Sequence, residues 1–209
     1  MKKFLHFSLM MLCSFALSAN AQNGTFSDVA GVVSWLNGNE TNATVSTEIT
    51  DAVLETSVKV GTDLTVTGPT TYSSIPEATT ALVTYQPTTG NPGCVSGDMI
   101  EYKVKLQKGL TFKPTSVSFD AVKEGTDNAY FSWSYTIDGV EGDIVAYSTP
   151  KDQIRRNNNA NPTAPLTHTE TISATSGREF TLRFYLSNVD SSKKMSIGNI
   201  KINGVVNGT

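Results

Sequence analysis

The sequence predicts an all-β fold, an antiparallel β-sandwich or barrel, and three observations support this. The chain is rich in Thr, Ser, Val, Asn and Gly, and it lacks long helical stretches of Leu, Ala, Glu and Lys. Short runs in which apolar and polar residues alternate recur along it. Turn-forming Gly, Pro, Asn and Asp separate these runs, as is typical of antiparallel strands joined by short loops.

The expected strands follow from the alternating runs in chain order. They lie at 32–36, 56–60, 64–68, 81–87, 99–106, 116–122, 130–137, 179–189 and 195–206. In three of them the alternation separates a buried face from a wet face, because successive side chains of a strand point to opposite sides. The residues predicted to point inward are Ile100, Tyr102, Val104, Leu106, Val117, Phe119, Ala121, Phe180, Leu182, Phe184 and Leu186.

The last expected strand changes phase between Ile197 and Ile200. Strict alternation would place these two isoleucines on opposite faces. A β-bulge at Gly198-Asn199 would return both of them to the core, because a bulge adds one residue to one strand only.

The stretch "NAYFSWSYTIDG" (128–139) packs four aromatic residues into six positions. One face carries Phe131, Trp133, Tyr135 and Ile137, whereas the other carries Tyr130 followed by Ser and Thr. We expect the face with the tryptophan to be buried, the alternative being a platform on which a ligand stacks. Asp138-Gly139 predicts a two-residue hairpin turn.

Residues 1–21 are predicted to be a signal peptide. Lys2 and Lys3 precede an apolar run at 4–17, and Ala19-Asn20-Ala21 supplies the small residues read by signal peptidase. The run is shorter than the roughly 18 apolar residues of a membrane span. We expect cleavage before Gln22, no membrane span, and a secreted, periplasmic or cell-surface product in which 22–209 form a single β-sandwich domain.

A lipoprotein is the alternative at this end, because Cys13 lies inside the apolar run. Met10, Met11 and Leu12 precede it, which are not the small residues that lipidation requires, so simple secretion is favoured. Cleavage leaves one cysteine, Cys94, and one histidine, His168.

This inventory excludes several chemistries. One cysteine cannot form an internal disulfide, and one histidine with one cysteine cannot supply the usual closed zinc site. His168 lies in the polar run "LTHTET" without a nucleophile motif, so we expect an exposed histidine on a strand or loop and not a member of a catalytic triad. The formal net charge of −3, with no run of Lys or Arg, argues against nucleic acid as a partner.

Three stretches resemble a known family. They are "KGLTFKPTSVSFDAVKEGTDNA" (108–129), "RRNNNANP" (155–162) and "KMSIGNIKINGVVNGT" (194–209). They are similar to an accessory β-sandwich module found at the N-terminus of secreted polysaccharide lyases, esterases and hydrolases of Bacteroidetes-type bacteria. The resemblance implies a jelly-roll or galactose-binding-like fold, a carbohydrate-binding role in polysaccharide degradation, no enzymatic activity, and a catalytic domain or enzyme outside this chain.

Sugar sites combine flat aromatic rings with planar polar side chains, which predicts candidate residues independently. Tyr130 and Tyr185 lie on faces expected to be wet, and Trp35, Tyr72 and Tyr147 lie near loops. One polar loop offers Gln153, Arg155, Arg156, Asn157, Asn158 and Asn159. The two arginines could pair with the carboxylates of an acidic pectic glycan; the alternative is a solvated loop without a ligand.

A structural calcium ion is a further hypothesis. Acidic residues cluster near glycine turns, which suits a cation that prefers oxygen ligands, although ordinary turns use the same residues. The clusters are Asp120, Glu124 and Asp127, and Asp138, Glu141 and Asp143.

Three functions are therefore compared. The favoured one is a secreted carbohydrate-binding-like module for an oligosaccharide or polysaccharide, plant cell-wall or pectic polymers among them. The second is an adhesin or spacer of the cell envelope, which predicts no exposed cleft with an aromatic beside paired polar side chains. The third is an enzyme, such as a lyase working through Arg or Lys, or a glycosidase, which would need two carboxylates across a cleft.

Overall fold

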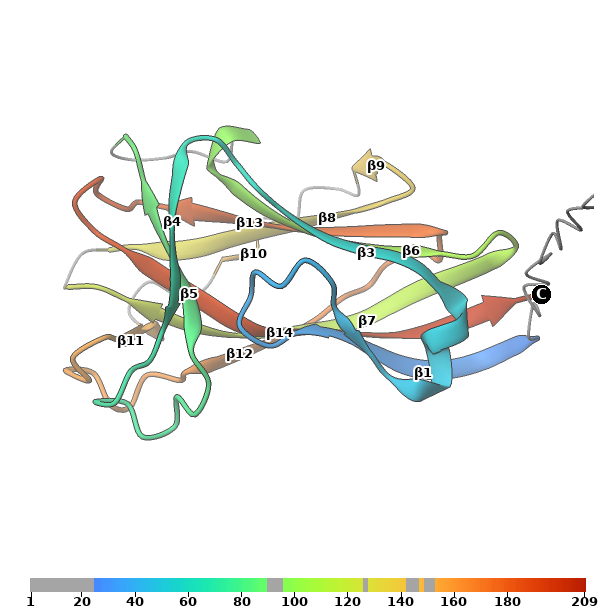
Figure 1. Cartoon of the computed structure of the whole chain (residues 1–209), viewed down its shortest axis with the longest axis horizontal. Helices are drawn as coiled ribbons and strands as arrows, with labels where there is room; N and C mark the ends of the chain where they lie inside the picture. The colour runs from blue at the N-terminus through green and yellow to red at the C-terminus, as the bar shows by residue number, and fades with distance from the viewer. Residues whose placement is uncertain (1–24, 90–95, 126–127, 142–146, 149–152) are drawn as a thin grey trace, which may run out of the picture.

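Two β-sheets pack face to face in the computed structural model, which describes residues 25–89, 96–125, 128–141, 147–148 and 153–209 (Figure 1). Strand pairing is antiparallel except between β11 and β7. This confirms the predicted antiparallel β-sandwich. The predicted signal peptide, Cys94, Asp127 and Asp143 lie outside the described residues.

The larger sheet has the order β11-β7-β14-β1-β2, with β12 paired to β7, and with β5 paired to β14 and β4. Its strands are β1 (Phe26–Trp35), β2 (Thr44–Val45), β4 (Leu64–Thr70), β5 (Leu82–Pro87), β7 (Leu110–Lys123), β11 (Arg155–Arg156), β12 (Thr167–Thr171) and β14 (Met195–Gly208).

The smaller sheet has the order β10-β8-β13-β6-β3, with β9 paired to β8. Its strands are β3 (Val53–Val60), β6 (Met99–Leu106), β8 (Tyr130–Ile137), β9 (Val140–Glu141), β10 (Tyr147–Ser148) and β13 (Glu179–Ser187). Two 3₁₀ helices, η1 (Thr47–Ala52) and η2 (Ser96–Asp98), complete the described elements. None of the helices described here is long and apolar enough to cross a membrane.

The chain passes repeatedly from one sheet to the other. Apart from β4 and β5, which are paired with each other in the larger sheet, the strands of five or more residues alternate between the two sheets in sequence order: β1, β3, β4 with β5, β6, β7, β8, β12, β13 and β14. This alternation is the jelly-roll form of a sandwich, in which each sheet is assembled from strands distant in sequence.

The core between the sheets is aromatic and aliphatic. Every residue predicted to point inward from β6, β7 and β13 is at most 1% exposed. The Tyr102 and Phe184 rings lie 6.0 Å apart, and the Phe119 and Phe184 rings lie 4.8 Å apart, both edge to face. Burial of each such side chain contributes about 1.5–3 kcal/mol relative to exposure.

The aromatic run at 128–139 faces the core, as predicted. Phe131 and Trp133 are fully buried, whereas Tyr135 is half-buried and packs on Phe180 with ring centroids 5.8 Å apart. Asp138 and Gly139 have φ of 50° and 75°, the left-handed values of a type I′ turn, and they join β8 to β9. The predicted hairpin is confirmed.

Trp35 corrects one sequence-based expectation. It was a candidate ligand-facing aromatic near a loop, but its side chain is fully buried and its ring lies 5.1 Å from that of Tyr102. It ends β1 on the inner face of the larger sheet, so the sandwich encloses it.

The predicted bulge in β14 is present. Gly198 is opposite Asp120 and Lys201 is opposite Ser118, so Asn199 and Ile200 together face one residue of β7. Ile197 and Ile200 are both fully buried. Asn199 takes φ of 46°, and its amide group donates to Asp120 Oδ2 at 3.2 Å.

We predict that Asn199→Val destabilises the fold by about 1–3 kcal/mol, because a β-branched residue is strained at positive φ. Asn203→Val is the matched control, since Asn203 lies in the same strand and also donates a side-chain hydrogen bond, to Ser116 Oγ at 3.0 Å. Urea unfolding of both variants measures the difference. Equal losses would contradict a strained bulge.

His168 corrects a second expectation. It lies on a strand, β12, but it is buried, at 8% exposure, and its ring stacks on Phe119 with centroids 5.4 Å apart. Its register partner on β7 is Phe119, so both side chains point to the inner face. Burial is the main cause that lowers the pKa of His168, and the charge of Asp120 opposes this.

The lowered pKa predicts that stability decreases in mild acid. The folded histidine binds a proton less readily than the unfolded one, whose pKa is about 6.5. The unfolded state therefore holds more protons as the pH falls through 6.5, and stability is lost until the pH reaches the folded pKa. Urea midpoints between pH 8 and pH 5 measure this decrease. His168→Leu should flatten it, and an unchanged slope would assign the decrease to other groups.

Candidate functional site

A hollow of about 180 Å³ opens on the larger sheet at the end where β7 finishes and β14 begins. Two strands, β4 and β5, and the segments next to β7, β11 and β14 form its wall. Its lining residues are Thr67, Thr70, Tyr72, Thr84, Glu124, Asn157 and Lys194. Figure 1 shows β4, β5 and β11 gathered at the end of the sandwich opposite the C-terminus.

A chain of hydroxyl groups lies along the hollow. The Tyr72 hydroxyl is hydrogen-bonded to Ser196 Oγ, Ser196 Oγ lies 2.7 Å from Thr84 Oγ1, and Thr84 Oγ1 lies 3.1 Å from Thr70 Oγ1. Ser196 and Thr84 are directly opposite each other in the β14–β5 pair, which explains their contact. Because each hydroxyl can donate or accept, the direction of the chain can reverse.

The Tyr72 side chain packs against a small apolar cluster. The buried members of this cluster are Ile75, Ala78, Leu82, Val122 and Leu166, and Tyr72 packs against them. Its ring is half-buried and its hydroxyl is fixed by Ser196, so the ring forms a defined wall of the hollow.

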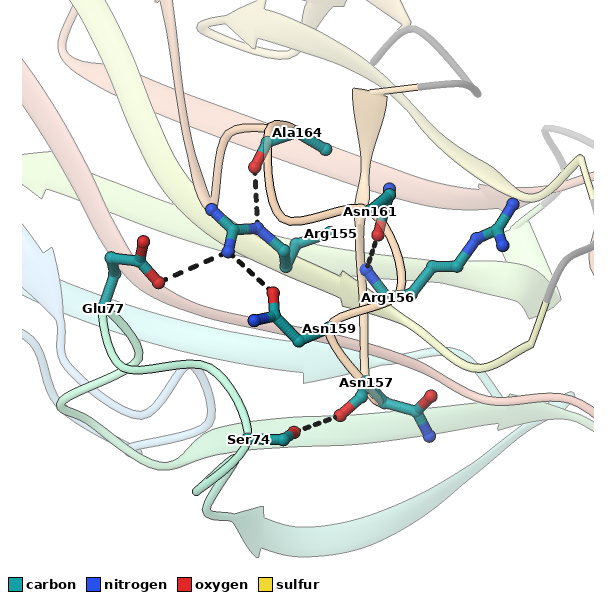
Figure 2. Close-up of polar contacts among 8 residues, drawn as sticks. All are labelled: Ser74, Glu77, Arg155, Arg156, Asn157, Asn159, Asn161 and Ala164. Carbon is teal, nitrogen blue, oxygen red and sulfur yellow. Dashed lines mark hydrogen bonds and ion pairs between the residues drawn. The ribbon is translucent and has the colours of Figure 1, made fainter.

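Asn157 is positioned by its main chain. Its backbone N–H donates to Lys123 O at 2.9 Å, and its carbonyl oxygen accepts from Ser74 Oγ at 2.6 Å. Figure 2 shows the Ser74 contact and the amide side chain extending from it. Both backbone groups are satisfied within the protein, and Asn157 is one of the residues that line the hollow.

The side chain of Arg155 was expected to be exposed on its loop, but it is buried there. It is 5% exposed. Its Nε donates to Ala164 O at 2.7 Å, and its Nη1 donates to Asn159 Oδ1 at 3.0 Å and to Glu77 Oε2 at 3.3 Å (Figure 2). The expectation that Arg155 contacts a glycan is therefore corrected, because its guanidinium joins the two ends of its own loop.

The other residues predicted in this loop have separate environments. Arg156 is half-buried, and Figure 2 shows its side chain extending away from Arg155 and Asn157. Asn158 is exposed and its Oδ1 accepts from the Ala160 N–H at 3.1 Å, while Gln153 is exposed before β11. Among the loop residues proposed from the sequence, the hollow includes Asn157.

Tyr130 and Tyr185 lie on the smaller sheet, away from the hollow. Tyr185 is opposite Ser132 and Tyr130 is opposite Ser187, so the two half-buried tyrosines are diagonal neighbours on one face of the β8–β13 pair. Ser132 Oγ and Ser187 Oγ, at 2.9 Å, are hydrogen-bonded between them. This surface is distinct from the hollow. The structure describes no side chain for Tyr147, so its candidacy stays a prediction.

Sequence reasoning missed most of the hollow. It named Tyr72 and Asn157 as ligand candidates and Glu124 as a calcium candidate, but not Lys194 or the threonines. The threonines lie on strands, where Thr is common, so composition alone could not single them out. The run "TGPTTYSS" (67–74), polar with one aromatic, was the available indication.

The acidic clusters considered for calcium carry other contacts. The two carboxylate oxygens of Asp120 accept from Thr167 Oγ1 at 2.5 Å and from Asn199 Nδ2 at 3.2 Å, and Asp138 Oδ1 accepts from the Glu179 N–H at 2.8 Å. No group of three Asp, Glu, His or Cys residues that could hold a metal occurs within the described ranges. Each cluster also includes a residue outside those ranges, so calcium stays a prediction.

No protein-family model matches the chain, and no curated protein matches it. Many solved structures are similar to this chain, among them three at low identity. TmCBM61, in complex with beta-1,4-galactotriose, has 8% identity and a TM-score of 0.33 over 74% of this chain and 88% of its own. A family two carbohydrate esterase from Cellvibrio japonicus has 9% identity and a TM-score of 0.31 over 74% of this chain and 36% of its own.

The third structure, CpGH89CBM32-6 produced by Clostridium perfringens, has 19% identity and a TM-score of 0.27 over 69% of this chain and 91% of its own. These TM-scores are low. The role of the hollow is therefore inferred from its own residues and their contacts.

The contacts of Arg155 predict a stability effect that separates its hydrogen bonds from its ion pair. Arg155→Met should cost about 1–3 kcal/mol, because the carbonyl of Ala164 loses its buried donor. Glu77 is 58% exposed on its side chain, so Glu77→Gln should cost less than about 1 kcal/mol. Urea unfolding compares the two variants. A loss for Glu77→Gln as large as that for Arg155→Met would assign the effect to the ion pair.

Proposed function

We propose that this chain is a secreted, non-catalytic carbohydrate-binding module and that the hollow on the larger sheet is its binding site. One observation carries the proposal. The hollow brings an aromatic ring, Tyr72, together with an amide, Asn157, a carboxylate, Glu124, an ammonium group, Lys194, and threonine hydroxyls.

Each of these groups matches a feature of a sugar. A pyranose presents several hydroxyls, which donate to carboxylate and amide oxygens and accept from ammonium and amide N–H groups. Its C–H faces are apolar and pack against aromatic rings. Small-molecule sites generally combine an apolar wall with a few convergent polar groups, and the hollow has both.

The adhesin or spacer alternative is less well supported. It predicts no exposed cleft with an aromatic beside paired polar side chains, whereas the hollow places Tyr72 beside Glu124 and Asn157. A glycosidase needs two carboxyl groups across its cleft. Glu124 is the one carboxylate among the described residues that line the hollow.

The position of the hollow suits an accessory module. The first described strand and the last are paired at the far end of the sandwich, with Phe26 opposite Gly208. The hollow adjoins Met195, at the other end of β14, roughly 40 Å away along an extended strand. A catalytic domain joined beside Gly208 would leave the hollow open to a polysaccharide of the plant cell wall, which we propose as the polymer class.

Affinity electrophoresis tests the proposal on residues 22–209, with pectins, xylans, galactans and β-glucans in the gel. We expect one polymer class to retard the protein. Asn157→Ala should weaken this retention about 3- to 10-fold, because it removes one hydrogen-bonding group of the wall. Asn42→Ala, at an exposed position outside the hollow, is the matched control.

Two outcomes would change the proposal. Absence of retardation by every polymer would reject carbohydrate binding and favour the adhesin or spacer. If Asn157→Ala leaves the retention unchanged, the binding site lies outside the hollow. The surface of Tyr130 and Tyr185 would then be mutated next. A parallel gel with EDTA tests calcium, since loss of retention there would show that a divalent cation supports binding.

A further inference from the structure

We infer that the hollow binds one uncharged sugar residue, such as a chain end or a side branch, and not a uronate of the kind considered in the sequence analysis. This inference rests on the proposed function and refines its ligand. It follows from three properties of the hollow: its charges, its hydroxyl chain and its size.

The charges of the hollow oppose selection of an anion. Lys194 supplies one positive group and Glu124 one negative group to the same small space. A uronate carboxylate that approached Lys194 would also face Glu124, and like charges in one site repel. A neutral sugar meets no such conflict, because its hydroxyls can donate to Glu124 and accept from Lys194.

Of the two arginines considered for a uronate, Arg155 is engaged elsewhere and Arg156 does not line the hollow. Paired recognition of a carboxylate typically uses the fork of an arginine. Arg155 uses its Nε and Nη1 on Ala164, Asn159 and Glu77, and it is buried. The described lining of the hollow contains no arginine.

The hydroxyl chain favours hydroxyls as ligands. Thr70 and Tyr72 are the two ends of the chain that runs through Thr84 and Ser196, and both line the hollow. Thr70 Oγ1 also lies 3.5 Å from Gly68 O, a long contact that a ligand hydroxyl can replace. Since every link can reverse, Thr70 Oγ1 can present either a donor or an acceptor to the ligand. A sugar hydroxyl can use both states, whereas a carboxylate oxygen accepts only.

The volume of the hollow suits one sugar ring. Sites that enclose drug-sized ligands usually measure about 300–1,000 Å³. The hollow, at about 180 Å³, is smaller and has room for a single pyranose or furanose. Neighbouring residues of a polymer would then lie outside it, so the end of a chain or a branch fits better than an internal segment.

Titration of the protein of residues 22–209 tests this inference. The probes are the methyl glycosides of glucose, galactose, mannose, xylose and arabinose, compared with glucuronate and galacturonate at the same ionic strength. Amide chemical shifts report binding and its place. We expect at least one neutral glycoside to saturate, with shifts at Asn157 and Lys194, and both uronates to bind at least tenfold more weakly.

Two matched variants connect the binding to the hydroxyl chain. Thr70→Val keeps the shape of the side chain and removes the hydroxyl. It should weaken the affinity for the neutral glycoside about fivefold or more. Thr65→Val is the control, because Thr65 is an exposed residue of the same strand and does not line the hollow. Equal affinity for both variants would overturn the role of the hydroxyl chain.

The outcomes separate this inference from the proposed function. If uronates bind as tightly as neutral glycosides, the preference for a neutral sugar is wrong, while carbohydrate binding itself is still supported. Polymers that are retained in the gel while no single glycoside binds would overturn one-residue recognition. Failure of every polymer and every glycoside would reject the proposed function itself.

Discussion

The bulge in β14 is the constraint on which the rest of the larger sheet depends. One edge of β14 pairs with β5 over its first residues and with β1 over the remainder, while the other edge pairs with β7 throughout. The extra residue between these two parts keeps Ile197 and Ile200 in the same core despite the change of partner. Without it, the segment that brings Ser196 to Thr84 would turn its hydroxyl inward, and the polar wall of the hollow would not form.

Two further contacts turn this sheet end into a defined hollow. Arg155 connects parts of its own loop through Ala164 and Asn159, and Lys123 and Ser74 hold the backbone of Asn157 beside it. The apolar cluster of Ile75, Ala78, Leu82, Val122 and Leu166 packs against Tyr72 and fixes its ring. A buried cation and a small core therefore have the same effect, since both hold polar groups from distant parts of the chain in one arrangement without the proposed ligand. Such preorganisation limits the entropy lost on binding.

The aromatic residues illustrate how burial removes candidates for ligand contact. Trp35, Phe131 and Trp133 are the rings most suited to stacking on a ligand, yet all three are enclosed between the sheets. Tyr72, less conspicuous in the sequence, lies at the hollow. His168 follows the same rule, because its place opposite Phe119 draws a histidine from a polar run into the core. In each case the position of the residue on the sandwich, and not its type, decides what it contacts.

The sequence by itself determined the sandwich class, the inward faces of β6, β7 and β13, the Asp138-Gly139 hairpin and the presence of a bulge between Ile197 and Ile200. These features depend on the two-residue period of a strand and on local turn geometry, and residues close together in the sequence specify both. Only the tertiary structure decided the hollow, the burial of Arg155 and the environment of His168. Each of these depends on contacts between segments that the jelly-roll topology brings together, such as Tyr72 with Ser196, and no local pattern specifies which distant strands become neighbours.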